Sequence, residues 1–296
     1  MNNGKASKTR IVLIYILTLI FSAAFAIFVH AIFPASVEVD KLDGFLVRVL
    51  GFQVVAVGYF LLLYIQCTAA VRYVTRRAGV SNLQAGVRMG ISFALVYLIG
   101  MQEVLVGSSP FTAYGLEYIR YEFFMGLGDA IPVFALCIII ALFTKKNKGG
   151  TAIAGEMGRS GSMLTVIIIA AGFLIERTIG YETGIVLSEH NTSTVPCYIW
   201  TAVFGIVLGC IFVELYPVWG SGRKWINIPV KFALVVGVNW IIFNSFIGMI
   251  LKGVMSQMLL RSGLDVAVLF AASCIAVKLT GRGTIASQQA SSFPSL

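Results

Sequence analysis

Eight long apolar segments dominate this chain and decide what it can fold into. Seven of them reach at least 20 residues, the length that an α-helix needs to cross the hydrocarbon core of a bilayer. Backbone N–H and C=O groups must pair internally in lipid, so segments of this kind form helices. The segments cover residues 11–34, 44–71, 84–108, 124–143, 163–187, 197–216, 229–251 and 265–280, and the last one can begin earlier, near Leu259. The predicted fold class is all-α, a polytopic integral membrane protein with about eight transmembrane helices.

The composition supports the same conclusion and excludes several classes of protein. Hydrophobic residues make up 58% of the 296 residues and charged residues only 12%, about half the share that a soluble domain carries. Most of the surface must therefore contact the lipid bilayer, which excludes a soluble enzyme and a disordered chain. We predict one transmembrane bundle over residues 1–280 and a disordered, Ser- and Gln-rich cytoplasmic tail over residues 281–296.

The positive charges predict the orientation of the bundle. Sixteen of the 22 Lys and Arg residues lie at the N-terminus or in every second connection, five lie on the opposite side, and Arg177 lies within a span. Basic residues concentrate on the cytoplasmic side of membrane proteins. We therefore expect an integral protein of the cell (plasma) membrane with both termini in the cytoplasm. The net charge of +9 follows from this orientation, and we expect no nucleic-acid partner.

The two halves of the chain resemble each other weakly, which predicts an internal repeat. Span two matches span six at an offset of 152 residues, and Asp129 of span four matches Asp265 at an offset of 136. The halves would be residues 11–143 and 163–280. Because each half holds four spans, this 4+4 repeat would be parallel, and transporters with such repeats place substrate sites between the halves.

One segment between spans three and four has no counterpart in the second half. Aromatic residues recur with helical spacing from Phe111 to Phe124. We expect a separate amphipathic helix lying in the membrane interface, where Tyr side chains are favoured. The alternative interpretation is a lid over an external cavity.

Polar residues inside the spans are the best indication of a functional site. A charged side chain near the bilayer centre costs several kcal/mol, so it usually faces the protein interior. Glu176 and Arg177 lie about 14 residues into span five and should meet partners on other helices. The candidate substrate- or ion-binding residues are Glu176, Arg177, Glu182, Asp129, Glu103, Arg48, Asn239 and Asn244. The alternative is that these residues only hold helices together, which is the favoured interpretation for the two asparagines.

Small residues spaced four apart allow helices to approach closely. Such pairs are Gly86/Gly90, Gly180/Gly184 and Gly205/Gly209, and they could also bind a partner membrane protein. No nucleotide-binding loop or hydrolase motif occurs in the chain, and it has only two histidines. We therefore predict no catalytic residue, no metal and no cofactor.

Three functional hypotheses remain. The first is a transporter of a small solute or ion through a polar site between the two four-helix halves. The second is a non-catalytic membrane subunit, assembly factor or immunity protein. The third and least favoured is a membrane-embedded enzyme that uses Glu176 or Asp129 as an acid, because the chain lacks paired acids at fixed spacing.

Overall fold

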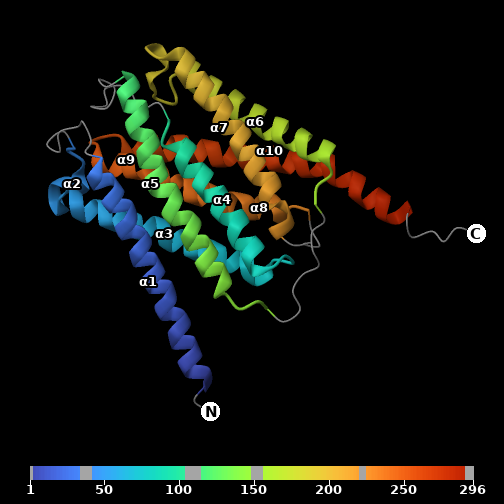
Figure 1. Ribbon diagram of the computed structural model, residues 1–296. Coiled ribbons are helices and arrows are strands. Elements are labelled where there is room, and N and C mark those ends of the chain that lie inside the picture. Colours follow the sequence, from blue (N-terminus) through green and yellow to red (C-terminus); the bar gives the residue numbers. More distant parts are fainter. Residues whose placement is uncertain (1–2, 34–41, 104–114, 148–155, 220–224, 291–296) are drawn as a thin grey trace, which may run out of the picture.

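The computed structural model describes residues 3–33, 42–103, 115–147, 156–219 and 225–290, and these residues form helices joined by short connections, with no strand among them (Figure 1). Within these ranges, eight helical segments are long and apolar enough to cross a membrane. The predicted all-α, eight-span architecture is therefore confirmed. The protein is a multi-pass integral membrane protein.

Six of the spans are single helices and two are built differently. The six single helices are α1 (Asn3–Ile32), α3 (Phe52–Arg77), α4 (Asn82–Gly100), α5 (Gly115–Leu142), α6 (Arg159–Glu182) and α10 (Met255–Ala290). The sixth span begins with α7 (Thr194–Leu215). After α7, the 3₁₀ turn Tyr216–Trp219 extends the sixth span. The seventh span consists of α8 (Asn227–Phe232), a π-helical stretch over Ala233–Gly237, and α9 (Val238–Ile250). A π-helical turn shifts the helix register locally and is often found at functional sites.

The second apolar segment begins with a short separate helix. Helix α2 (Phe45–Leu50) ends at Gly51, whose φ of +83° is a left-handed conformation that glycine adopts without steric cost. The membrane-spanning helix α3 starts only at Phe52. The predicted span 44–71 is therefore divided, and its helical part reaches further, to Arg77.

The last span begins ten residues earlier than the apolar segment that predicted it. Helix α10 starts at Met255, so Arg261 and Asp265 lie within the span. The alternative start near Leu259 is therefore the better prediction, and Arg261, which interrupts the apolar pattern, lies inside the span. Helix α10 continues to Ala290 and therefore includes residues 281–290, whereas the remaining residues of the predicted tail lie outside the described ranges.

The expected separate interface helix at residues 111–124 is wrong for the part that the structure describes. Residues 115–124 form the first turns of α5, which continues without a break through Pro132 to Leu142. Gly126 and Gly128 lie close against Leu98 of α4 and Val29 of α1, so this part of α5 packs on neighbouring helices. Phe124 stacks on Phe33, the residue after α1, at 4.8 Å between ring centroids. Residues 111–114 lie outside the described ranges.

The glycine pairs bring helices of this chain together. A Cβ atom on Gly86 would lie 2.8 Å from Ala141 of α5, and one on Gly209 would lie 2.8 Å from Val166 of α6. Gly90 and Gly205 likewise lie against α5 and α6. These faces are therefore occupied by the chain's own helices, α4 on α5 and α7 on α6. Gly180 packs against Val186, and Gly184 adopts a positive φ in the turn after α6.

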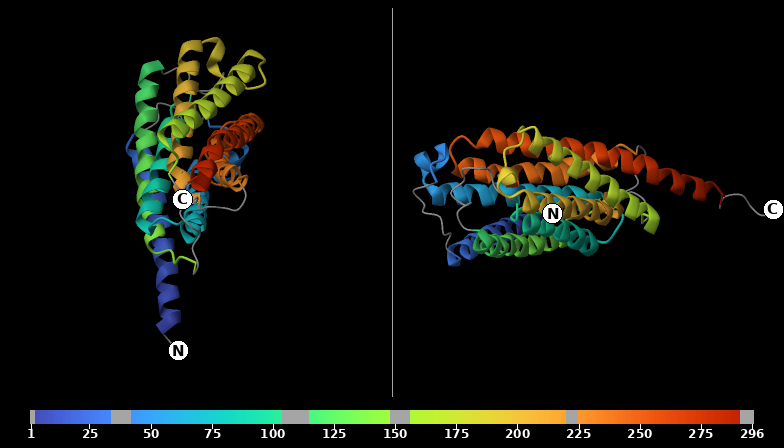
Figure 2. Two further views of the ribbon diagram at one scale, coloured as in Figure 1. Left: turned by 90° about the vertical axis from the view of Figure 1, so that its right-hand side faces the viewer. Right: turned by 90° about the horizontal axis from the view of Figure 1, so that it is seen from above.

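The helices α1, α4 and α5 lie side by side, and α10 lies on the other side of the bundle and extends beyond it (Figures 1 and 2). Helix α10 packs against α6 and α9. The contacts α3–α9 and α4–α7 join the spans within residues 11–143 to those within residues 163–280. We call this boundary the seam.

Candidate functional site

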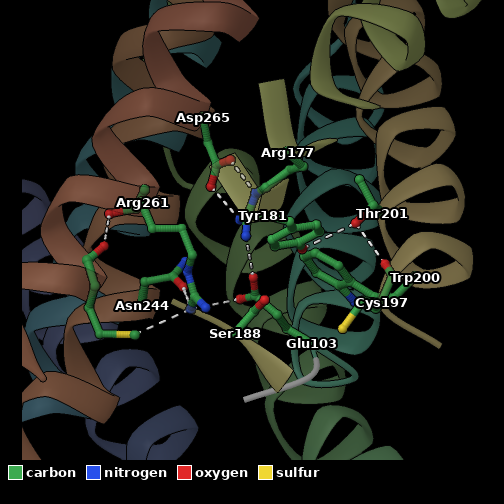
Figure 3. Close-up of polar contacts among 12 residues, drawn as sticks. Glu103, Arg177, Tyr181, Ser188, Cys197, Trp200, Thr201, Asn244, Arg261 and Asp265 are labelled. Carbon is green, nitrogen blue, oxygen red and sulfur yellow. Dashed lines mark hydrogen bonds and ion pairs between the residues drawn. The ribbon is translucent and has the colours of Figure 1, made fainter. Parts of the chain in front are cut away.

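Arg177 is the centre of a buried ionic cluster (Figure 3). Its side chain is fully buried, and its Nε and Nη2 atoms donate to the two carboxylate oxygens of Asp265 at 2.8 and 2.7 Å. This two-bond geometry is the strongest form of an arginine–carboxylate contact. Trp240 of α9 also donates its indole N–H to Asp265, at 2.8 Å. Asp265 therefore accepts three hydrogen bonds.

A second arginine extends the cluster across the seam. Glu103, just after the end of α4, accepts from Nη1 of Arg177 at 2.9 Å and contacts Nη2 of Arg261 at 3.0 Å. The same Nη2 donates to the amide oxygen of Asn244 at 3.0 Å. Residues from α4, α6, α9 and α10 thus meet in one network, and each of these side chains is at most 7% exposed.

Two members of this cluster have unused hydrogen-bonding atoms. The Nε and Nη1 atoms of Arg261 are buried and donate to none of the described residues. Both carboxylate oxygens of Glu176 are buried too, and no described residue donates a hydrogen bond to them. The nearest cationic atom to Glu176 is Nε of Arg177 at 3.7 Å, and that N–H already points to Asp265.

Aromatic rings enclose the guanidinium group of Arg177. Its Cζ atom lies 5.3 Å from the ring centroid of Phe173 and 5.5 Å from that of Trp200, distances at which cations attract aromatic faces. Arg177 lies roughly 8 Å from the end of α6 and Asp265 roughly 15 Å from the start of α10, at 1.5 Å rise per residue. The cluster therefore reaches toward the middle of a hydrocarbon core about 30 Å thick.

A second polar group lies deeper along the same seam. The side-chain amide of Asn239 donates to Gln66 at 2.8 Å and to the Tyr97 hydroxyl at 2.9 Å, and it lies 3.4 Å from the Cys67 sulfur. Gln66 in turn donates to the carbonyl oxygen of Val235 at 3.2 Å, within the π-helical stretch. Asn239 and Trp240 are neighbours on α9, so polar groups continue along this helix from the ionic cluster toward mid-span.

A separate charged pair joins α1 and α5. Nε2 of His30 lies 3.1 Å from Oδ1 of Asp129. The Asp129 side chain is 3% exposed and that of His30 is 23% exposed. The predicted candidate Asp129 is therefore buried and paired, but with a residue of the first span.

The structure brings four predicted candidates together and places the other four elsewhere. Glu103, Glu176, Arg177 and Asn244 belong to the ionic cluster. Asn239 belongs to the deeper group and Asp129 to the pair with His30. Glu182 is 61% exposed at the end of α6, where it accepts from Tyr198 at 2.8 Å. Arg48 lies on the exposed surface of α2.

Sequence reasoning missed Arg261, Trp240 and His30 as partners, and it noted Asp265 only as a repeat match. Arg261 and Asp265 are four residues apart, which places them on one face of α10. This spacing could have been noticed if the last span had been drawn from Met255. His30 lies at the end of a strongly apolar segment, where a single histidine is only a weak indication of a buried polar contact.

Comparisons with protein-family models, with curated proteins and with solved structures find no match for this chain. The site must therefore be interpreted from its own geometry. Among the described residues, no three His, Cys, Asp or Glu side chains are grouped to hold a metal ion. Carboxylates and guanidinium groups such as those of the cluster are groups that can bind protons or oppositely charged small groups.

Proposed function

We propose that this protein transports a small solute or ion through a polar site on the seam between its two four-helix halves. The observation that carries the proposal is the concentration of buried polar contacts at this boundary. Arg177 and Arg261 from the second half meet Glu103 from the first, and Asn239 from the second half meets Gln66 and Tyr97 from the first.

The amount of buried charge argues against a purely structural role. Hydrogen bonds between transmembrane helices contribute about 1 kcal/mol or less each, so uncharged residues can hold a bundle together. Five ionisable side chains in one buried cluster carry a large desolvation cost that helix packing does not require. Residues of this kind inside membranes usually mark the path of a substrate or ion.

The free donor atoms of Arg261 favour a solute with an anionic group. Nε and Nη1 are charged N–H donors on two different edges of the guanidinium, and such donors bind carboxylates and phosphates strongly. Both atoms are buried and without an acceptor among the described residues. An anionic group that entered the seam could accept from either atom, so small carboxylic acids and amino acids are the first solutes to test.

The test is a transport assay with a matched, charge-neutral variant. The purified protein would be reconstituted in liposomes, and currents would be recorded on solid-supported membranes during jumps of small carboxylates, amino acids, Na⁺ or K⁺. We expect a saturable signal from the wild type and none from the double variant R177M/D265L. Because this variant removes one charge of each sign, it should remain folded, and its thermal unfolding would be measured in parallel.

The control for this assay is E182Q, which changes a carboxylate that is 61% exposed and outside the cluster. We expect E182Q to transport at the wild-type rate. A folded wild type with no solute-dependent signal would contradict the proposal and would favour the non-catalytic membrane subunit. Full transport by R177M/D265L would instead show that the cluster only joins helices.

The orientation belongs to the same proposal, with both termini in the cytoplasm of a cell membrane. The support for it is the asymmetry of Lys and Arg between the two sets of connections. Reporter fusions after Lys148 and after Arg282 should both be cytoplasmic, and a fusion near His190 should be external. Reversal at any one of the three positions would overturn this topology.

A further inference from the structure

Among the residues that the structure describes, the buried ionic cluster has one more carboxylate than it has cations. Its acids are Glu103, Glu176 and Asp265, and its bases are Arg177 and Arg261. Helix α7, which also packs against α6, has Glu214 as its single charged residue. Glu214 lies at the opposite end of α7, 3.4 Å from Arg88. With every group ionised, the cluster would therefore carry a net charge of −1 in a medium that solvates ions poorly.

The hydrogen bonds show which carboxylate is the extra one. Asp265 accepts from Arg177 through two atoms and from Trp240. Glu103 accepts from Arg177 and lies 3.0 Å from Arg261. Glu176 accepts no hydrogen bond from a described residue, and the nearest cationic atom, Nε of Arg177 at 3.7 Å, donates to Asp265 instead, although the Glu176 side chain is only 9% exposed and both oxygens are buried.

We propose that Glu176 binds a proton in this arrangement and is the proton-carrying residue of the cluster. A proton from water adds to one carboxylate oxygen to give the neutral acid, and no other bond changes. The neutral acid brings the net charge of the cluster to zero and removes the cost of a buried, unpaired anion. It also converts one unused acceptor into a donor, which the adjacent carboxylates can accept.

Protonation of Glu176 depends only on this geometry, but its use in transport rests on the proposed function. If the seam is a transport path, the proton is the coupling ion. Glu176 would release it when the cluster opens to water, where a carboxylate is well solvated, or when a bound cationic group takes its place.

The experiment is infrared spectroscopy of the purified full-length protein, which detects the C=O stretch of protonated carboxylic acids. At neutral pH we expect one protonated-acid band in the wild type that is lost in E176Q and retained in E182Q. Gln is neutral and nearly isosteric with the protonated acid, so E176Q should keep the wild-type unfolding temperature. A band that persists unchanged in E176Q, or a wild type without it, would overturn the inference.

Repeating the measurement with Na⁺, K⁺ or choline as the main cation separates a proton from a metal cation. We expect the band to be the same in all three. If the band appears in choline but vanishes in Na⁺ or K⁺, the site binds that metal ion and the inference is wrong. A protonated-acid band without any solute-dependent current would support the proton site and contradict transport. A current that changes neither with pH nor in E176Q would contradict the role of the proton in transport but not transport itself.

Discussion

Two charged contacts in this molecule join the first and the fourth span of a half, and they differ in strength and in chemistry. His30 of α1 meets Asp129 of α5 through one hydrogen bond of 3.1 Å. Arg177 of α6 meets Asp265 of α10 through two, at 2.8 and 2.7 Å. The His30 side chain is 23% exposed whereas Arg177 is fully buried. Imidazole can lose its charge near neutral pH, but a guanidinium cannot.

This difference in charge explains why the His30–Asp129 contact is isolated, whereas the Arg177–Asp265 contact belongs to a larger network. Because His30 can become neutral, a partner for it need not be permanent. Arg177 stays charged, and two carboxylates pair with it: Asp265 accepts from Nε and Nη2, and Glu103 accepts from Nη1. A buried charge that cannot be discharged must be paired at all times.

The placement of the two pairs also bears on the predicted 4+4 repeat, which we retain as a proposal. Asp129 and Asp265 match in the sequence comparison, and each pairs with a basic residue near the end of the first span of its own half. The contacts α3–α9 and α7–α4 are equivalent under the same correspondence. A superposition of residues 11–143 on 163–280 that placed Asp129 and Asp265 at opposite ends of the bundle would contradict the repeat.

The two pairs should differ most in how far the free energy of unfolding falls when the carboxylate is replaced. D265N should lower the free energy of unfolding by about 3–5 kcal/mol, because it leaves a fully buried arginine underpaired. D129N should cost only about 1 kcal/mol, the usual net value of one hydrogen bond, because His30 can give up its proton. Thermal and chemical unfolding in detergent would measure both variants, and equal losses would show that the two contacts do not differ in the way described.

The next difference lies in how mutations combine. D265N and E103Q remove two acids that share Arg177, so their effects should deviate from additivity by about 0.5–3 kcal/mol. D265N and D129N have no shared partner in the contacts above and should add to within about 0.5 kcal/mol. Unfolding of the two double variants beside the singles would measure both coupling energies. Additive behaviour of D265N and E103Q would mean that the cluster does not act as one network.

The smallest expected effect is the pH dependence that the His30 contact produces. The imidazolium form binds Asp129 more strongly than the neutral form does, so this contact stabilises the fold at acid pH. The stabilisation should fall by about 1 kcal/mol as pH rises from about 5 to 8. Unfolding temperatures of the wild type and H30Q across this range would measure it, and the variant should have the flatter profile. A slope unchanged in H30Q would assign the pH dependence to another group.

The sequence predicted the membrane spans well because the tendency to enter lipid is a local property of 20 residues. The predicted span boundaries differ from the structure where a single residue interrupts an apolar segment or lies unexpectedly inside a helix. The left-handed Gly51 divided the second apolar segment, and Arg261 interrupted the apolar pattern within the first turns of α10. A hydropathy pattern treats every charge as an interruption, although a charge with partners on other helices can lie inside a span.

The sequence by itself determined that this chain has eight membrane spans and that Glu176 and Arg177 must be kept away from lipid. Both conclusions follow from the cost of placing unsatisfied polar groups in hydrocarbon, which a single segment already specifies. Which side chains contact these two residues depends on the tertiary structure. Arg177 is separated from Asp265 by 88 residues and from Glu103 by 74, so the pairing depends on how α4, α6 and α10 are rotated and staggered against one another. That arrangement is set by packing across the whole bundle, including the close approach of the glycine faces, and no local pattern encodes it.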